Sequence, residues 1–167
     1  MIEKFLIPQS IIILLISLVG SIFDCKYRKI PNWLNFGTVI LALLYNLIHL
    51  NLNGIVFSLL GFIVGIAVLF IPYLMGGMGA GDVKLLGAIG SIVGFKKILW
   101  IFFYSGISGL FLGIIWIIFS PGHLKFLITT GKVLPPVDKK QKLPYGLAIL
   151  FGVIAYIILG TDRFLFF

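Results

Sequence analysis

The 167-residue sequence has few charged side chains. Lys, Arg, Asp and Glu together make up 11% of it, about half of the share that is usual in soluble domains. Hydrophobic residues make up 60%, and the mean hydropathy is +1.19. So little polar surface cannot cover a water-soluble particle. The composition therefore excludes an ordinary soluble domain and predicts a protein embedded in a lipid bilayer.

Cysteine and histidine are also scarce. Cys25 is the only cysteine, which excludes an intrachain disulfide and a four-cysteine zinc site. His49 and His123 are isolated in the sequence and have no partner at metal-ligand spacing, so we expect neither a metal nor a cofactor. The net charge is +8, but the basic residues lie between apolar runs. This pattern favours contact with anionic lipid and indicates no nucleic-acid partner.

Six apolar stretches indicate helices of one membrane-embedded domain, residues 1–167. The stretches cover residues 5–23, 33–50, 54–75, 83–93, 97–119 and 143–159. Most approach the ~20 residues that cross a bilayer, and the first offers no small-residue cleavage site, so we interpret it as a retained helix. The fourth is short and follows a Gly-rich turn, as in broken helices that line a protein cavity. We predict an all-α polytopic bundle of about six transmembrane helices with a short, broken fourth helix.

The distribution of basic residues predicts an orientation. If the N-terminus lies outside, nine Lys and Arg fall on the cytoplasmic side and four on the outer side. Cytoplasmic loops are enriched in Lys and Arg, so we expect a multi-pass protein of the cytoplasmic membrane with its N-terminus outside. This prediction depends on six spans.

Two of the five acidic residues stand at the edge of an apolar run. Asp24 follows the first stretch and Asp82 precedes the fourth, and the predicted topology puts both on the cytoplasmic side. Glu3, Asp138 and Asp162 lie near the termini or in the Lys-rich loop, where water is accessible. Ionisable groups at membrane depth are costly and are therefore candidates for function.

A pair of carboxyl groups can hydrolyse a peptide bond. Two such groups held close together share one proton, so the ionised member can take a proton from water while the protonated member polarises the scissile carbonyl. Simpler roles remain open. Asp24 could be a headgroup-level anchor paired with Lys26 or Arg28, and Asp82 could be the N-cap of the fourth helix.

The sequence around the aspartates contains three recognisable blocks. Asp24 is followed six residues later by Ile30-Pro31-Asn32, and Asp82 lies in Gly79-Ala80-Gly81-Asp82-Val83-Lys84. A third block is Leu143-Pro144-Tyr145-Gly146. In order and spacing, these blocks resemble the signature blocks of the type IV prepilin peptidase family, a group of Gly-x-Gly-Asp membrane aspartyl peptidases.

This resemblance implies an endopeptidase that cuts the leader peptide from a prepilin or pseudopilin at the cytoplasmic face. The family's catalytic aspartates correspond to Asp24 and Asp82. The supporting motif residues would be Gly79, Gly81, Lys84, Pro31 and Asn32. We expect the glycines either to adopt unusual backbone angles and admit a substrate closely, or to form a plain flexible turn. We interpret Lys84 as a lipid or loop anchor, and Pro31 and Asn32 as the start of the second helix.

The sequence departs from many bacterial members in one respect. Those members carry paired Cys-x-x-Cys motifs and also N-methylate the trimmed pilin, whereas this chain has one cysteine. We therefore expect the short, peptidase-only form. The presenilin and signal-peptide-peptidase group shares Gly-x-Gly-Asp but has Tyr where Phe23 stands. A small ion- or proton-coupled transporter that uses the same aspartates is the alternative from another class.

Overall fold

The computed structural model describes residues 2–75, 77–119 and 145–159. This part of the chain forms helices and contains no strand, so the all-α prediction is confirmed. The helices are α1 (Ile2–Tyr27), α2 (Asn32–Leu50), α3 (Leu52–Leu74), α4 (Ala80–Val93), α5 (Phe95–Phe119) and α7 (Tyr145–Leu159). The basic loop on which the predicted orientation largely depends lies outside the described residues.

Four of these helices are long and apolar enough to cross a membrane. They are α1 from Pro8 onward, α2, α3 and α5, with 19 to 23 residues in each apolar segment. α4 has 14 residues and the described α7 has 15. At 1.5 Å per residue, α4 is only about 21 Å long, less than the ~30 Å hydrocarbon core. The short fourth helix of the prediction is therefore confirmed.

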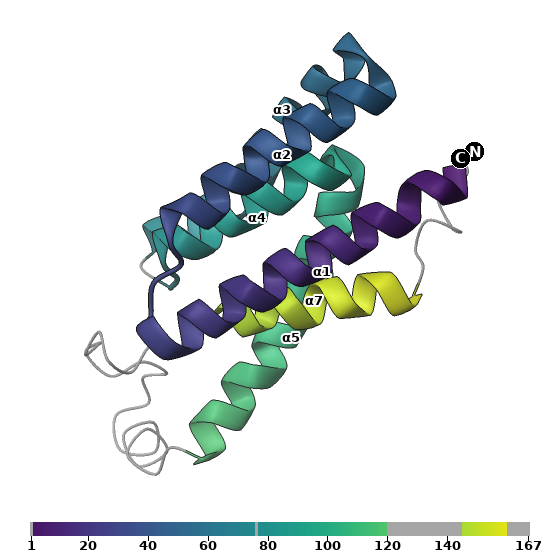
Figure 1. Ribbon diagram of the computed structural model, residues 1–167. Helices are drawn as coiled ribbons and strands as arrows, with labels where there is room; N and C mark the ends of the chain where they lie inside the picture. The colour runs from purple at the N-terminus through teal and green to yellow at the C-terminus, as the bar shows by residue number, and fades with distance from the viewer. Residues whose placement is uncertain (1, 76, 120–144, 160–167) are drawn as a thin grey trace.

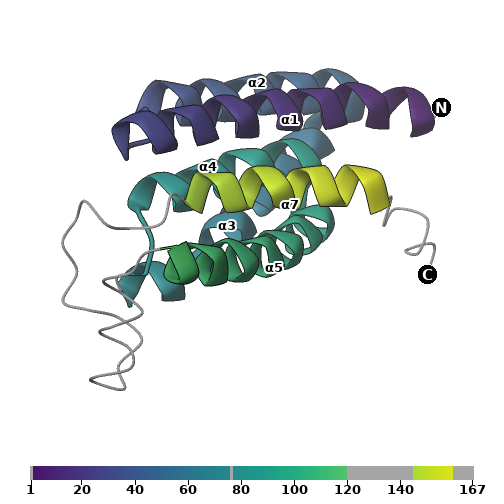
Figure 2. The same cartoon turned by 90° about the horizontal axis from the view of Figure 1, so that it is seen from below.

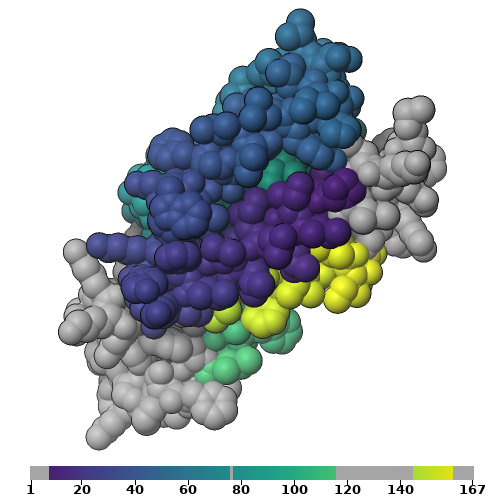
Figure 3. Space-filling model, viewed as in Figure 1, coloured from purple at the N-terminus to yellow at the C-terminus, as the bar shows by residue number. Residues whose placement is uncertain are grey.

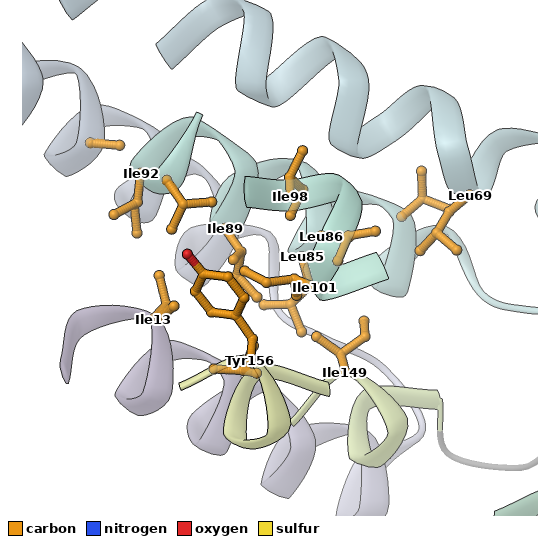
Figure 4. Close-up of a cluster of buried hydrophobic side chains, with 14 of the residues drawn as sticks. Ile13, Leu69, Leu85, Leu86, Ile89, Ile92, Ile98, Ile101, Ile149 and Tyr156 are labelled. Carbon is orange, nitrogen blue, oxygen red and sulfur yellow. The ribbon is translucent and has the colours of Figure 1, made fainter. Parts of the chain in front are cut away.

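The helices form three layers, with α4 in the middle layer. Seen from the side of the bundle, α1 and α2 form one layer, α4 and α7 the next, and α3 and α5 the third (Figure 2); Figure 1 shows the same helices from another side. From Asp82 onward, every residue of α4 except Lys84 is buried. Isoleucine and leucine side chains of α4 pack against Ile13 of α1, Ile101 of α5 and Ile149 of α7 (Figure 4). α4 is therefore the element around which the others are arranged.

Glycines allow α3 and α4 to pack backbone against backbone. A Cβ atom on Gly61 of α3 would collide with the Gly90 carbonyl of α4, and a Cβ on Gly90 would collide with the Gly61 carbonyl. One turn along, a Cβ on Gly65 would lie 2.7 Å from the Leu86 carbonyl oxygen. Lipid gives no hydrophobic drive for two apolar helices to associate, so close packing through small residues is what holds such a pair together.

The C-terminal end of α4 is satisfied by side chains within the bundle. The last carbonyls of a helix lack intrahelical partners, and in a membrane no water can supply them. Gln9 Nε2 of α1 donates to the Ile92 carbonyl at 3.1 Å, and Asn46 Nδ2 of α2 donates to the Ser91 carbonyl at 3.0 Å. Gly94, with φ +81°, turns the chain directly into α5. These contacts explain how a helix can stop inside the membrane region.

Both aspartates belong to helices rather than to the junctions that the sequence predicted. α1 continues to Tyr27, and the Arg28 N–H donates to the Asp24 carbonyl at 2.9 Å, so Asp24 lies in the last turn. α4 begins at Ala80, three residues before the predicted boundary. The end of α1 and the starts of α2, α4 and α7 lie at the same end of the bundle (Figure 1). Asp24 and Asp82 are therefore at one end of the molecule.

Gly61→Ala is expected to destabilise the bundle, because its Cβ would press on the α4 backbone, which cannot rotate away. Overpacking of this kind costs about 1–3 kcal/mol. The matched control is Gly106→Ala in α5, where a Cβ meets nothing within 4 Å. Thermal unfolding of both variants in detergent would measure the difference. Equal melting temperatures for the two variants would contradict the close α3–α4 contact.

Candidate active site

Asp24 is held by the first turn of α7. Its side chain is 8% exposed, and Oδ2 accepts a hydrogen bond from the Gly146 N–H at 2.9 Å. The first N–H groups of a helix lack intrahelical acceptors and carry partial positive charge, so a carboxylate satisfies them well. A Cβ on Gly146 would lie 2.9 Å from the Asp24 Cβ, which shows that only glycine admits this approach. α7 therefore positions the carboxyl group of α1.

Asp82 is held by the loop that precedes its own helix. Its side chain is 6% exposed, and Oδ2 accepts from the Gly79 N–H at 3.0 Å. Gly79 is the N-cap and Asp82 the third helical residue, so the carboxyl reaches back as the acidic member of a capping box does. The alternative that Asp82 is itself the N-cap is therefore wrong. Oδ1 is buried and has no hydrogen-bond partner in the described structure.

The two aspartates open on one cavity of about 290 Å³. It is lined by Asp24, Arg28, Lys29, Ile30, Asn32, Gly79, Ala80, Gly81, Asp82 and Lys84. Six of the seven residues singled out in the sequence therefore meet here. The seventh, Pro31, does not line the cavity; it is the N-cap of α2, with φ −68° and ψ 139°. The prediction that Pro31 and Asn32 set the start of the second helix is confirmed.

Gly79 and Gly81 do not have unusual backbone angles. Gly79 is extended, with φ −85° and ψ 152°, a conformation open to any residue, and Gly81 is helical. Among the described glycines, only Gly94 has a positive φ. The expectation of unusual φ and ψ is therefore wrong. Glycine is needed at these two positions because a Cβ would press on a neighbouring side chain. A Cβ on Gly81 would lie 3.2 Å from the Ile30 Cβ, and one on Gly79 would lie 3.3 Å from Asp82 Oδ2.

Lys84 connects the two sequence blocks. Its Nζ donates to Asn32 Oδ1 at 3.1 Å, a contact between α4 and the first residue of α2. This interhelical bond replaces the interpretation of Lys84 as a lipid or loop anchor. Lys84 and Asp82 face different directions on α4, as residues two apart on a helix must, yet both reach the cavity wall. The bond therefore ties the turn after Asp24 to the helix that carries Asp82.

Burial and charge make Asp82 hard to ionise. Asp82 lies at the start of α4, outside the four helices long enough to span a membrane. Burial raises the pKa of Asp82 to about 7, the negative charge of Asp24 also raises it, and the Gly79 N–H lowers it. A carboxyl pair with this property keeps one proton near neutral pH.

The sequence did not reveal the contribution of Gly146. The block at residues 143–146 resembles the family's entry to its last helix, but the sequence does not indicate its contact with Asp24, because Gly146 and Asp24 are 122 residues apart and meet only through packing. Arg28 entered the sequence analysis only as a possible partner of Asp24, and Ile30 only as part of its block, although both line the cavity. The first two residues of that block, 143 and 144, lie outside the described residues.

A comparison with protein-family models identifies the chain. Residues 11–114 match the model of the type IV leader peptidase family. The chain belongs to this family. The matched region runs from α1 into α5 and includes Asp24, Asp82 and both blocks around them. The resemblance noted from the sequence is therefore confirmed.

One curated relative is the preflagellin peptidase of Methanocaldococcus jannaschii, which is 34% identical over 80 residues. The aligned segment is 46% of this chain and 34% of the relative, so the match spans about a third of the relative's length. No solved structure matches the chain.

Gly146→Ala is expected to lower the turnover number of a reaction that uses the Asp24 carboxyl, with little change in KM, because its Cβ would push that carboxyl out of place. A displacement of this size costs up to about 100-fold in rate. The matched control is Gly37→Ala in α2, where a Cβ meets nothing within 4 Å. Steady-state kinetics and melting temperatures of both variants would check this. A Gly146→Ala enzyme with parental turnover would rule out the positioning role of α7.

Proposed function

We propose that the chain is a membrane aspartyl endopeptidase that removes the leader peptide from a type IV prepilin-like precursor, with Asp24 and Asp82 as the catalytic residues. One observation carries the proposal: the two buried carboxyl groups, from α1 and α4, open on one cavity in a member of the type IV leader peptidase family. The precursor would be of the pilin or flagellin type, as the name of the preflagellin peptidase relative suggests.

The environments of the two carboxyl groups indicate which one acts as the acid and which one as the base. Asp82 is the protonated member, because its pKa is raised to about 7 and its buried Oδ1 has no hydrogen-bond partner in the described structure. An ionised oxygen would be costly there, whereas an O–H can donate to the substrate's carbonyl oxygen. Asp24 is then the ionised member. The Gly146 N–H occupies its Oδ2 and leaves Oδ1 to act as the base.

The reaction follows from these roles. Asp24 takes a proton from a water molecule, whose oxygen attacks the scissile carbonyl carbon, while Asp82 gives its proton to the carbonyl oxygen. The tetrahedral intermediate collapses when Asp24 passes its proton to the leaving nitrogen, and the C–N bond breaks. A hydroxyl proton of the intermediate returns to Asp82. Both carboxyl groups end in their starting states, and no covalent enzyme intermediate forms.

Further features support cleavage at the cytoplasmic face by a peptidase-only enzyme. Arg28, Lys29 and Lys84 all line the cavity, and positive charge at one end of a membrane bundle favours the cytoplasmic side. The N-terminus would then lie outside. Only residues 28–31 separate α1 from α2, so this turn holds no Cys-x-x-Cys insertion. We therefore propose that the protein does not methylate its product.

Asp24→Asn and Asp82→Asn are each expected to lower precursor cleavage by about 10²–10⁴-fold, because each variant removes one half of the acid–base pair. The control is Cys25→Ser, a change at an exposed residue next to Asp24. Co-expression with a candidate precursor, read by the shift in its mobility, would measure processing. Parental processing by both asparagine variants would contradict the aspartyl mechanism. A parent that leaves every precursor uncut would favour the transporter alternative.

The cleavage rate is expected to fall as the pH rises through about 7, because the raised pKa of Asp82 keeps it protonated below that pH and ionised above it. The free energy of unfolding is also expected to fall as the pH rises from 3.8 to about 7, because in this range the folded state holds a proton on Asp82 that the unfolded state has released. kcat/KM measured in detergent between pH 5 and 9 would show the alkaline limb. A flat profile from pH 6 to 9 would contradict Asp82 as the acid.

A further inference from the structure

α1 and α2 both pack on α4 but scarcely touch each other. The surface is hollowed along this line, and teal atoms of the central helices show between the blue of α2 and the purple of α1 (Figure 3). Here we call this line the α1–α2 seam. It contains a cavity of about 280 Å³, the seam pocket, lined by Ile12, Leu41, Ala42, Leu44, Tyr45 and Ile92.

The seam pocket and the aspartate cavity lie on the same three helices. Along α1, the rise from Ile12 to Asp24 is about 18 Å at 1.5 Å per residue, and along α4 the rise from Asp82 to Ile92 is about 15 Å. The aspartate cavity takes its lining from α1, α4 and the start of α2, and the seam pocket takes its lining from the same helices further along. One occupant that follows the seam can therefore reach both.

The lining of the seam pocket selects an apolar occupant. Five of its six residues are aliphatic. Ala42, which is 1% exposed, forms the buried floor of the pocket on α2. Leu41 and Leu44, at 63% and 53% exposed, stand at the lipid-facing rim. A polypeptide that enters from lipid must satisfy its own backbone hydrogen bonds and is therefore helical.

We propose that the seam pocket binds an apolar side chain on a membrane-embedded helix of the substrate and so directs the peptide bond at one end of that helix to Asp24 and Asp82. This inference rests on the proposed function. The seam pocket and the aspartate cavity both lie on α1, α2 and α4. They are separated by about 15–18 Å of helix, so a substrate helix seated in the pocket places its end at the two carboxyl groups. A lipid acyl chain and a second copy of this protein are the competing occupants.

Filling the pocket tests the proposal. Ala42→Leu would occupy the space from within, and Leu44→Trp would cover it from the rim. The control is Leu110→Trp on α5, which is 61% exposed and does not line the pocket. Two substrates are compared in detergent: a full precursor with its apolar helix, and a short peptide that carries the same cleavage sequence without that helix.

For the full precursor, we expect KM to rise about tenfold in both pocket variants, as for loss of a fitted apolar contact. In both pocket variants, KM for the short peptide should stay parental. In Leu110→Trp, KM should stay parental for both substrates. Two pocket variants with parental KM for the precursor would overturn the proposal, and so would an equal rise for both substrates. A parent that cuts neither substrate would refute the proposed function itself, a result distinct from a parent that cuts both without using the pocket.

Cross-linking tests the occupant directly. In Cys25→Ser, Asp82→Asn protein, Leu44→Cys would be paired with single cysteines placed along the substrate helix, and Leu110→Cys would serve as the control. The strongest cross-link is expected about 10–12 residues from the scissile bond, the number that spans 15–18 Å of helix. Equal cross-linking at every position would contradict the proposal and favour a lipid-filled pocket. Cross-linking between two copies of the protein would assign the pocket to a homodimer instead.

Discussion

The structure depends on one constraint: α4 begins and ends within the bundle, so its free backbone groups must find partners in the protein. At its end, Gln9 of α1 and Asn46 of α2 donate to the last carbonyls. At its start, the Asp82 carboxyl accepts the N–H of the residue that caps the helix. In lipid an unsatisfied backbone group costs several kcal/mol, so these contacts hold α1 and α2 to α4 as well as completing the helix.

The same constraint explains how two carboxyl groups can be buried near each other. Each uses Oδ2 to accept the N–H of a glycine at a helix start, Gly146 for Asp24 and Gly79 for Asp82. Backbone donors stabilise both carboxyl groups, and the positive charge of Arg28 acts on Asp24. A cation bound to each of the two carboxyl groups would hold both in the ionised form. A pair of carboxyl groups that keeps one proton therefore needs neutral donors such as the glycine N–H groups. The polar contacts that close the helices therefore also hold the carboxyl groups of the proposed dyad, while burial is the main cause of the raised pKa of Asp82.

The sparse contact between α1 and α2 is consistent with the proposed function. Both helices are fixed to α4 by side-chain caps at one end, and at the other end the Lys84–Asn32 bond fixes α2 to α4 and the Gly146 N–H holds Asp24 of α1. The seam between them can therefore stay open toward lipid while the catalytic end remains held. A substrate that already lies in the membrane would then meet the aspartates without crossing a closed wall of helices.

The sequence by itself determined the class of fold and the chemical groups of the site. Apolar runs with few charges specify membrane helices whatever their neighbours, and the short apolar run after the Gly-rich turn indicated α4. Rare acidic residues at the edges of such runs indicated Asp24 and Asp82, because burying them without a function would be costly. Local pattern was enough for these conclusions, apart from the helix limits near Asp24 and Asp82.

Only the tertiary structure decided which atoms meet. The bond from Gly146 to Asp24 joins residues 122 positions apart, and that from Asn46 to Ser91 joins residues 45 apart; neither follows from local spacing. The roles of Gly79 and Gly81 also changed, from backbone flexibility to space for the Asp82 carboxyl and for Ile30, because a sequence shows a missing Cβ but not what lies where it would have been. Contact partners depend on how helices cross, and that is settled by packing over the whole bundle.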